Sequence, residues 1–317
     1  MRRRLLLNLI GVVILILLPI LLKSKPSFIA YINLAIIYAI ATEGLNLLIG
    51  VSGQISLGHA AFMGIGAYTS AVLIMSLHWP CILAIICGMI VAAFFGFIIG
   101  FPALRLKGFY LAIATMALGS AITDIIRRLP FTGGDQGLKN IPPISIFNFS
   151  FSSEISKYYL FLAILVVVAI LIGNFLKGKS GMGLRAMRDS EAGAVSYGVN
   201  ISYHKVLAFI VSSALAGLAG ALYAQSISYL NPTNFGLDLS INFLAITIIG
   251  GLGTIAGPIL GSVLWVIVPR FFGSRFSSMA TVIFGIILII VVLVLPNGLY
   301  ELIGRFNRLF RRTSKEQ

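Results

Sequence analysis

The sequence predicts an all-α protein, a polytopic bundle of transmembrane helices with about nine to ten membrane segments. Of the 317 residues, 59% are hydrophobic and only 10% are charged, so the chain has too few polar side chains to cover a water-exposed surface. Apolar stretches of about 20 residues, the length that spans a bilayer core, recur along the chain. Basic residues gather in the links between these stretches and at both ends. We therefore expect a single transmembrane domain over residues 1–317.

Apolar segments follow one another along the whole chain. They run at about 5–22, 28–50, 60–78, 81–104, 108–126, 158–176, 205–228, 240–268 and 277–296. The first segment follows three arginines, is longer than the core of a signal peptide and has no small-residue cleavage site after it. It is therefore predicted to be a membrane span with its N-terminus in the cytoplasm.

The segment 240–268 is interrupted by Gly250, Gly251 and Gly253. The basic tail 300–317 is typical of the cytoplasmic side, which requires an even number of crossings. Dividing the segment into two short or re-entrant pieces near 250–260 satisfies this requirement, and another short piece is expected near 50–60. Non-helical backbone inside a membrane is tolerated only where it is buried in protein or lines a cavity. The glycine break is therefore predicted to face other helices or a path across the membrane.

Two polar loops stand out between the apolar segments. The loop 127–157 is predicted to lie on the periplasmic side and is long enough to contact a soluble partner. The loop 177–205 carries several Lys and Arg residues and is predicted to be cytoplasmic.

The cytoplasmic loop contains a short capped helix. Asp189 and Ser190 are suitable N-terminal caps for a helix from Glu191 to Tyr197, which Gly198 would end. The interior of this helix is Ala192-Gly193-Ala194, and such small residues allow a second protein to approach closely. An amphipathic connector lying on the membrane surface explains the basic residues equally well.

Three motifs resemble binding or catalytic sites but lack the context that those sites need. Residues 173–180 match a phosphate loop, yet they straddle the end of a membrane segment instead of joining a strand to a helix. Residues 251–256 mimic a dinucleotide fingerprint inside a membrane segment, where helix packing is the better interpretation. His59, His78 and His204 lie in different segments with no carboxylate at ligand spacing. We expect no catalytic residue and no bound metal or cofactor.

The net charge of +14 does not indicate nucleic-acid binding, because base-stacking aromatic residues are not interleaved with the basic runs. Cys81 and Cys87 lie in one apolar stretch and are given no chemical role.

Ionisable residues within the apolar segments are candidate functional groups, because burying a charge in a membrane is costly. Three such residues are Glu43, Asp124 and His59. For Glu43, pairing with a neighbouring helix is slightly favoured over a place in a solute path. Close helix packing is predicted at two G-x-x-x-G pairs, Gly96/Gly100 and Gly257/Gly261.

Residues 46–68 resemble the signature of permeases from branched-chain amino acid ABC importers. The resemblance continues through residues 105–112, 132–138, 184–186, 214–223 and 250–258, so it covers nearly the whole chain. Of the two permeases that these importers pair, the chain is similar to the larger, M-type partner.

The resemblance implies alternating access in a bacterial inner membrane, with both termini cytoplasmic. It implies a second permease subunit, two cytoplasmic ATPase subunits that hydrolyse ATP-Mg, and a periplasmic substrate-binding protein as partners. In these importers a permease loop with the pattern E-A-A-x-x-x-G docks onto the ATPase. Here Ala192-Gly193-Ala194-x-x-x-Gly198 occupies that register, with Glu191 displaced by one position.

Three groups of candidate site residues follow. The ATPase-coupling group is Leu184, Arg185, Arg188, Glu191, Ala192, Gly193, Ala194 and Gly198. The group for the translocation path or helix packing is Glu43, Asn46, Gln54, Ser56, His59, Gly250, Gly251 and Gly253. The group for contact with the binding protein is Gly133, Gly134, Asp135 and Gly137.

Two alternatives remain open at this point. Importers of urea or short amides use similar permeases, because substrate identity resides largely in the binding protein. A secondary transporter or channel that works alone is the alternative from a different class.

Overall fold

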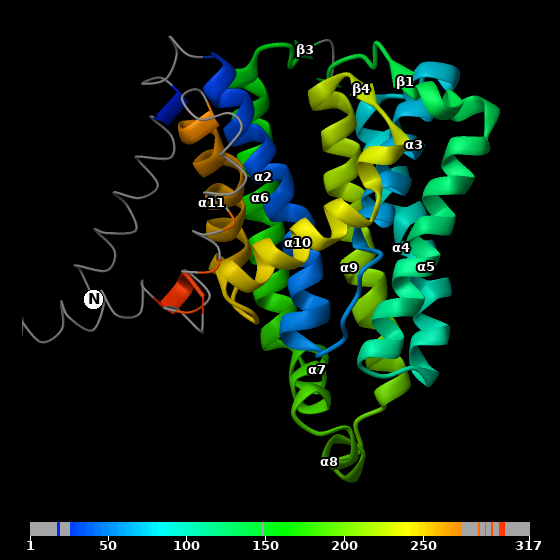
Figure 1. The fold of residues 1–317 in the computed structure, drawn as a ribbon, viewed down its shortest axis with the longest axis vertical. Helices are drawn as coiled ribbons and strands as arrows, with labels where there is room; N and C mark the ends of the chain where they lie inside the picture. Colours follow the sequence, from blue (N-terminus) through cyan, green and yellow to red (C-terminus); the bar gives the residue numbers. More distant parts are fainter. Residues whose placement is uncertain are drawn as a thin grey trace, which may run out of the picture.

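A computed structural model of the chain describes residues 26–146 and 149–273, with short pieces at 18–19, 285, 289, 293 and 298–301. The described part is an all-α bundle (Figure 1). Six of its helical segments are long and apolar enough to cross a membrane. They are α2 with the π-helical turn η1 (Pro26–Asn46 and Leu47–Val51), α3 (His59–Leu77), α4 (Cys81–Arg105), α5 (Phe109–Arg128), α6 (Glu154–Lys177) and α9 (Ile201–Ile227). The polytopic all-α prediction is confirmed, and the expected segments 5–22 and 277–296 fall almost entirely outside the described residues.

The expected division of segment 240–268 is present. Helix α10 (Leu237–Gly250) and helix α11 (Ala256–Gly273) are separate, and α10 lies across the bundle at mid-height in Figure 1. Gly251 and Gly253 between them have φ angles of 118° and 75°, which favour glycine and stop the helix. Near 50–60 the structure differs from a short re-entrant helix, because η1 ends at Val51 and residues 52–58 are not helical.

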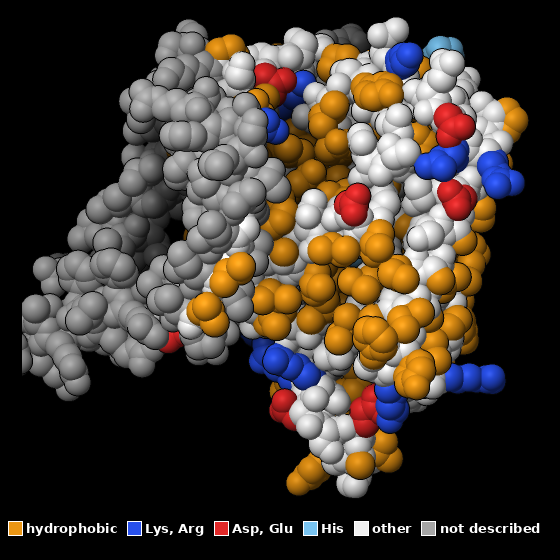
Figure 2. Space-filling model, in the orientation of Figure 1, with side chains coloured by type: hydrophobic (Ala, Val, Ile, Leu, Met, Phe, Trp, Pro, Cys, Tyr) orange, Lys and Arg blue, Asp and Glu red, His pale blue; other side chains and the backbone are white. Residues whose placement is uncertain are grey.

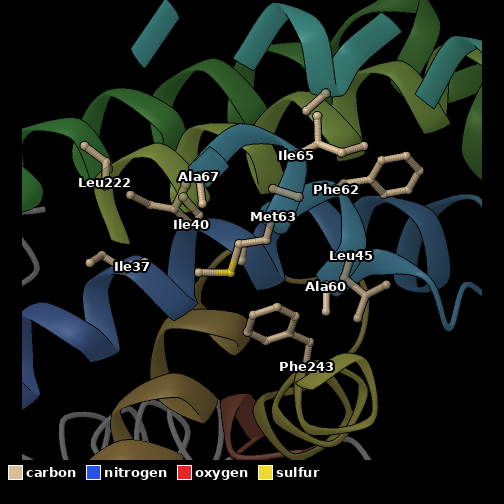
Figure 3. Packing of buried hydrophobic residues seen from close by; sticks show 14 of the residues in the cluster. Ile37, Ile40, Leu45, Ala60, Phe62, Met63, Ile65, Ala67, Leu222 and Phe243 are labelled. Atoms are coloured by element: carbon tan, nitrogen blue, oxygen red, sulfur yellow. The ribbon is translucent and has the colours of Figure 1, made fainter. Parts of the chain in front are cut away.

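Helix α9 lies at the centre of the bundle and packs against α2, α3 and α4. Small residues make this close packing possible: a β-carbon on Gly66 of α3 would lie only 2.1 Å from the Gly217 carbonyl oxygen of α9. Gly96 of α4 is equally close to Ser213, as its G-x-x-x-G pair predicted. Figure 3 shows the apolar side chains of α2, α3, α9 and α10 that fill the remaining space.

The two ends of the bundle carry different structures (Figure 1). At one end, α7 (Lys179–Asp189) and α8 (Glu191–Ser196) project beyond the long helices. At the other end lie the short helices η2 (Pro130–Thr132), η3 (Gly134–Gln136) and η4 (Pro232–Phe235) and two antiparallel strand pairs, β1 (Leu138–Lys139) with β4 (Tyr229–Leu230) and β2 (Ser145–Ile146) with β3 (Phe149–Ser150). Figure 2 shows hydrophobic side chains over the middle of the bundle and most Lys and Arg side chains nearer its ends, as a membrane-embedded middle requires.

Candidate functional site

The break between α10 and α11 is held by one side chain of α2. The Asn46 amide donates to the Thr254 carbonyl oxygen at 2.9 Å, and its oxygen accepts from the Gly253 backbone N–H at 2.7 Å. Backbone groups freed from a helix inside a membrane need such partners, since water is absent. Asn46 and the predicted glycines therefore form one structure, which joins α2 to the break.

Arg188 connects this structure to the projecting helix α7. Its guanidinium donates a hydrogen bond to the Gly50 carbonyl oxygen in η1. The last carbonyl groups of a helix lack partners within the helix, and the negative end of the helix dipole favours a cation there. Gly253 lies beside both groups, because a β-carbon on it would be 3.0 Å from the Gly50 oxygen and 3.4 Å from Arg188 Nη1. Arg188 thus reaches the point where α2 meets the break.

Glu191 lies in an ion-pair cluster at the start of α8. One carboxylate oxygen is 2.5 Å from Lys107 Nζ, in the link between α4 and α5, and the other is 2.7 Å from Lys205 Nζ in α9. Partial desolvation alone would raise the pKa of Glu191, but hydrogen bonds and charges from the two lysines outweigh it and lower the pKa below its ordinary value. Glu191 is therefore ionised at neutral pH and holds α8 to two other elements.

Helix α8 begins at Glu191 as predicted and ends at Ser196, one residue before the predicted end. Ser190 caps it by accepting from the Gly193 N–H at 3.1 Å, and Gly198 follows it with φ 77°, a conformation that suits glycine. Ala192 is exposed, whereas Ala194 is only 3% exposed and packs on the chain itself. Of the small residues expected to approach a partner, Ala194 is thus the least accessible.

The two remaining candidates of the coupling group lie on α7. Leu184 is fully buried and anchors the helix, whereas Arg185 is exposed.

Four other polar candidates of the membrane segments, Glu43, Gln54, Ser56 and His59, are buried, but they do not form one cluster. Asp124 is instead exposed and lies 3.6 Å from Arg127 Nη1. His59 Nε2 lies 2.8 Å from the Ala41 carbonyl oxygen, and its Nδ1 lies 3.5 Å from Ser212 Oγ of α9. Gln54 donates to Ser52 Oγ at 2.9 Å. Both carboxylate oxygens of Glu43, together with Ser56 Oγ and Gln54 Oε1, have no hydrogen-bond partner within the described part of the chain. The structure thus places Glu43 inside the bundle, and its pairing with a neighbouring helix stays a prediction.

The candidate contact loop for a binding protein lies at the end opposite α8 (Figure 1). Gly133, Gly134 and Gly137 have φ angles of 76°, 59° and 69°, so the loop turns sharply at each of them. Asp135 is exposed and its carboxylate lies 3.0 Å from Arg127 Nε. The loop is therefore ordered by glycine turns and one ion pair, and it presents a polar surface.

Sequence reasoning missed several partners of these residues. It gave no role to Lys107, Lys205 or Thr254, because nothing local marks a lysine or a threonine as the partner of a distant residue. It also missed a second polar cluster at the end of the bundle opposite α8. There Glu154 accepts from Asn33 Nδ2 at 2.9 Å and from Lys157 Nζ at 2.8 Å.

The sequence resembling a phosphate loop, residues 173–180, spans the end of α6 and the start of α7, and helix α6 rather than a strand precedes it.

These features are those of a multi-pass membrane protein with a broken helix in its interior. A short projecting helical segment is connected to that break through the hydrogen bond from Arg188 to Gly50. The chain belongs to the family described as the permease component of branched-chain amino acid transport systems, whose model matches residues 27–292. This is a family of transport subunits and not of enzymes.

Individual relatives agree with this assignment. The chain is 32% identical over 294 residues to the high-affinity branched-chain amino acid transport permease LivM of Escherichia coli, covering 84% of this chain and 68% of LivM. It is 26% identical to BraD of Pseudomonas aeruginosa (83% of this chain, 91% of BraD) and 25% identical to LivH of Salmonella typhimurium (84% and 92%). The greater identity to LivM supports the M-type assignment. No solved structure matches the chain.

Proposed function

We propose that this chain is the M-type permease subunit of an ABC importer that moves leucine, isoleucine and valine across the bacterial inner membrane. The observation that carries the proposal is the physical connection from α7 through Arg188 and Gly50 to the broken helix, in a chain of this transport family. Such a connection is what a subunit needs when an external motor drives a change inside the membrane.

In this proposal the chain works with a second permease subunit, two ATPase subunits and a substrate-binding protein. The ATPases dock on α7 and α8 at the cytoplasmic end, where Val195 and Tyr197 are exposed apolar side chains. ATP and Mg²⁺ bind to the ATPases, and this chain holds no cofactor. The binding protein docks on the outer loop with Asp135, and solute crosses by alternating access between the paired permeases.

Uptake by reconstituted vesicles tests the proposal. We expect labelled leucine to accumulate only when the second permease, both ATPases, ATP-Mg and the loaded binding protein are present. A matched control uses ATPases that bind ATP but do not hydrolyse it, which should abolish uptake without loss of assembly.

Two outcomes would contradict the proposal. Leucine uptake by this chain alone, driven by an ion gradient, would identify a secondary transporter. Competition by urea or short amides, with none by isoleucine and valine, would favour the alternative substrate class.

A further inference from the structure

We propose that Glu191 and Arg188 are positioning residues that transmit movement of α7 and α8 to the membrane interior, each through its own polar attachment. This inference rests on the proposed function and assigns the coupling step to particular side chains. The first attachment is the Glu191 cluster, which comprises Glu191, Lys107 and Lys205. The second is the bond from Arg188 to Gly50.

The Glu191 cluster ties the start of α8 to two separate elements. The side chain of Lys205 is only 5% exposed, so its charge depends on Glu191 for compensation. Lys107 is 71% exposed, and its ion pair is therefore weak and easily exchanged with water. Movement of α8 is therefore coupled strongly to α9 and only weakly to the link between α4 and α5.

The Arg188 attachment leads to a different place. It ends on Gly50, in the π-helical turn that closes α2, and Gly253 of the break lies beside it. Asn46 of α2 binds the Gly253 N–H and the Thr254 carbonyl oxygen, so α2 is joined to the link between α10 and α11. A displacement of Arg188 from Gly50 therefore acts on α2, α10 and α11 together. π-helical turns are rare in proteins, and those that occur are often found at functional sites.

A cavity of about 220 Å³ lies between the two attachments and gives the segment room to move. The residues that line it include both attachments, Arg188 and Glu191 with its two lysines, and also Gln54 and Met187. Gln54 Oε1 is an acceptor with no partner in the described part of the chain.

The test measures ATP hydrolysis and leucine uptake together in vesicles that hold the complete importer. We expect Glu191→Gln and Arg188→Met each to lower the number of leucine molecules moved per ATP by about tenfold, within the usual range for coupling between sites. ATP hydrolysis itself should continue, because the ATPases are separate chains. Co-purification of the ATPases shows that assembly is retained.

A matched control separates coupling from stability. Glu154→Gln removes a similar carboxylate from an ion pair with Lys157 at the opposite end of the bundle. It should lower thermal stability by a similar amount and leave the ratio of leucine to ATP unchanged. An equal fall of this ratio in the Glu154 variant would show that the effect is only structural and would overturn the inference.

A charge exchange keeps the inference testable if Glu191→Gln does not fold. Glu191→Lys combined with Lys205→Glu restores the ion pair between α8 and α9, and Lys107→Gln removes the like charge that would face the new lysine. This triple variant should recover coupling that Glu191→Lys alone loses. A wild-type ratio in Glu191→Gln overturns the inference, and so does failure of the exchange to recover coupling in an assembled importer. Absence of ATP-dependent uptake in the wild-type importer is a different result, which rejects the proposed function itself.

Discussion

Asn46 is the single residue on which the geometry of the broken helix depends most directly. Its side-chain amide makes hydrogen bonds to both Gly253 and Thr254. Asn has this ability because it offers a donor and an acceptor on one planar group.

Asn46→Leu tests this role at the residue scale. The substitution keeps the volume but leaves the Gly253 N–H and the Thr254 C=O without partners, which should cost about 1–3 kcal/mol of stability. The measurement is the unfolding of the purified protein in detergent, followed by helical circular dichroism.

Asn231→Leu serves as the comparison for this experiment. Asn231 also makes hydrogen bonds through both ends of its amide, to Thr233 and Tyr229, but it is partly exposed in the link between β4 and η4. Water replaces the lost partners there, so the loss should be clearly smaller. Equal losses in the two variants would show that Asn46 does not support the break.

Residues differ in how far the sequence revealed their roles. Ser190 and Gly198 were predicted as the start and end of a helix because capping depends on neighbours within a few positions. The role of Glu191 as the centre of an ion-pair cluster was not predictable, since both of its lysines come from other elements. Ala194 was expected to be available to a partner, and only the folded chain showed that it is buried.

At the scale of elements, the packing of α3 on α9 depends on the absence of side chains. Gly66 meets the Gly217 backbone so closely that no side-chain rearrangement makes room for a β-carbon. Gly173 of α6 is different, since a β-carbon there would meet only the end of the Ile255 side chain at 3.4 Å.

These two glycines give a matched pair of substitutions. Gly66→Ala should force the helices apart and destabilise the bundle by about 1–3 kcal/mol. Gly173→Ala should be neutral or slightly stabilising, because alanine favours a helix more than glycine does. Thermal melting in detergent distinguishes the two, and tolerance of alanine at both positions would show that α3 and α9 are not packed backbone to backbone.

The elements themselves were largely predictable from the sequence. Helices α2 to α6 and α9 lie close to the apolar segments from which they were expected, and the break after Gly250 was expected from its glycines. The stretch 52–58 was not expected to be non-helical throughout. Its composition is mixed, and its polar side chains are buried by contacts with other elements that a local pattern does not contain.

At the scale of the whole molecule, the prediction concerns orientation in the membrane. Tyr197, directly after α8, is 91% exposed at one end, and Phe149 of β3 is exposed at the other. In a chain with Cys81 and Cys87 replaced by alanine, Tyr197→Cys should react with a membrane-impermeant thiol reagent only after the cells are opened. Phe149→Cys should react once the outer membrane alone is permeabilised. The reverse pattern would invert the topology and move the ATPase contact away from α8.

The sequence by itself determined that this protein lives in a membrane, where most of its helices lie and which family it resembles. Hydrophobicity, helix length and capping are local properties, so they can be predicted from a short stretch of sequence. Only the tertiary structure decided which polar groups meet. Arg188 and Gly50 are 138 residues apart, and Asn46 and Thr254 are 208 residues apart. The packing of α2 against α10 and α11, and of η1 against α7, brings these distant groups together. A buried polar group there is stable only with the partner that the fold supplies.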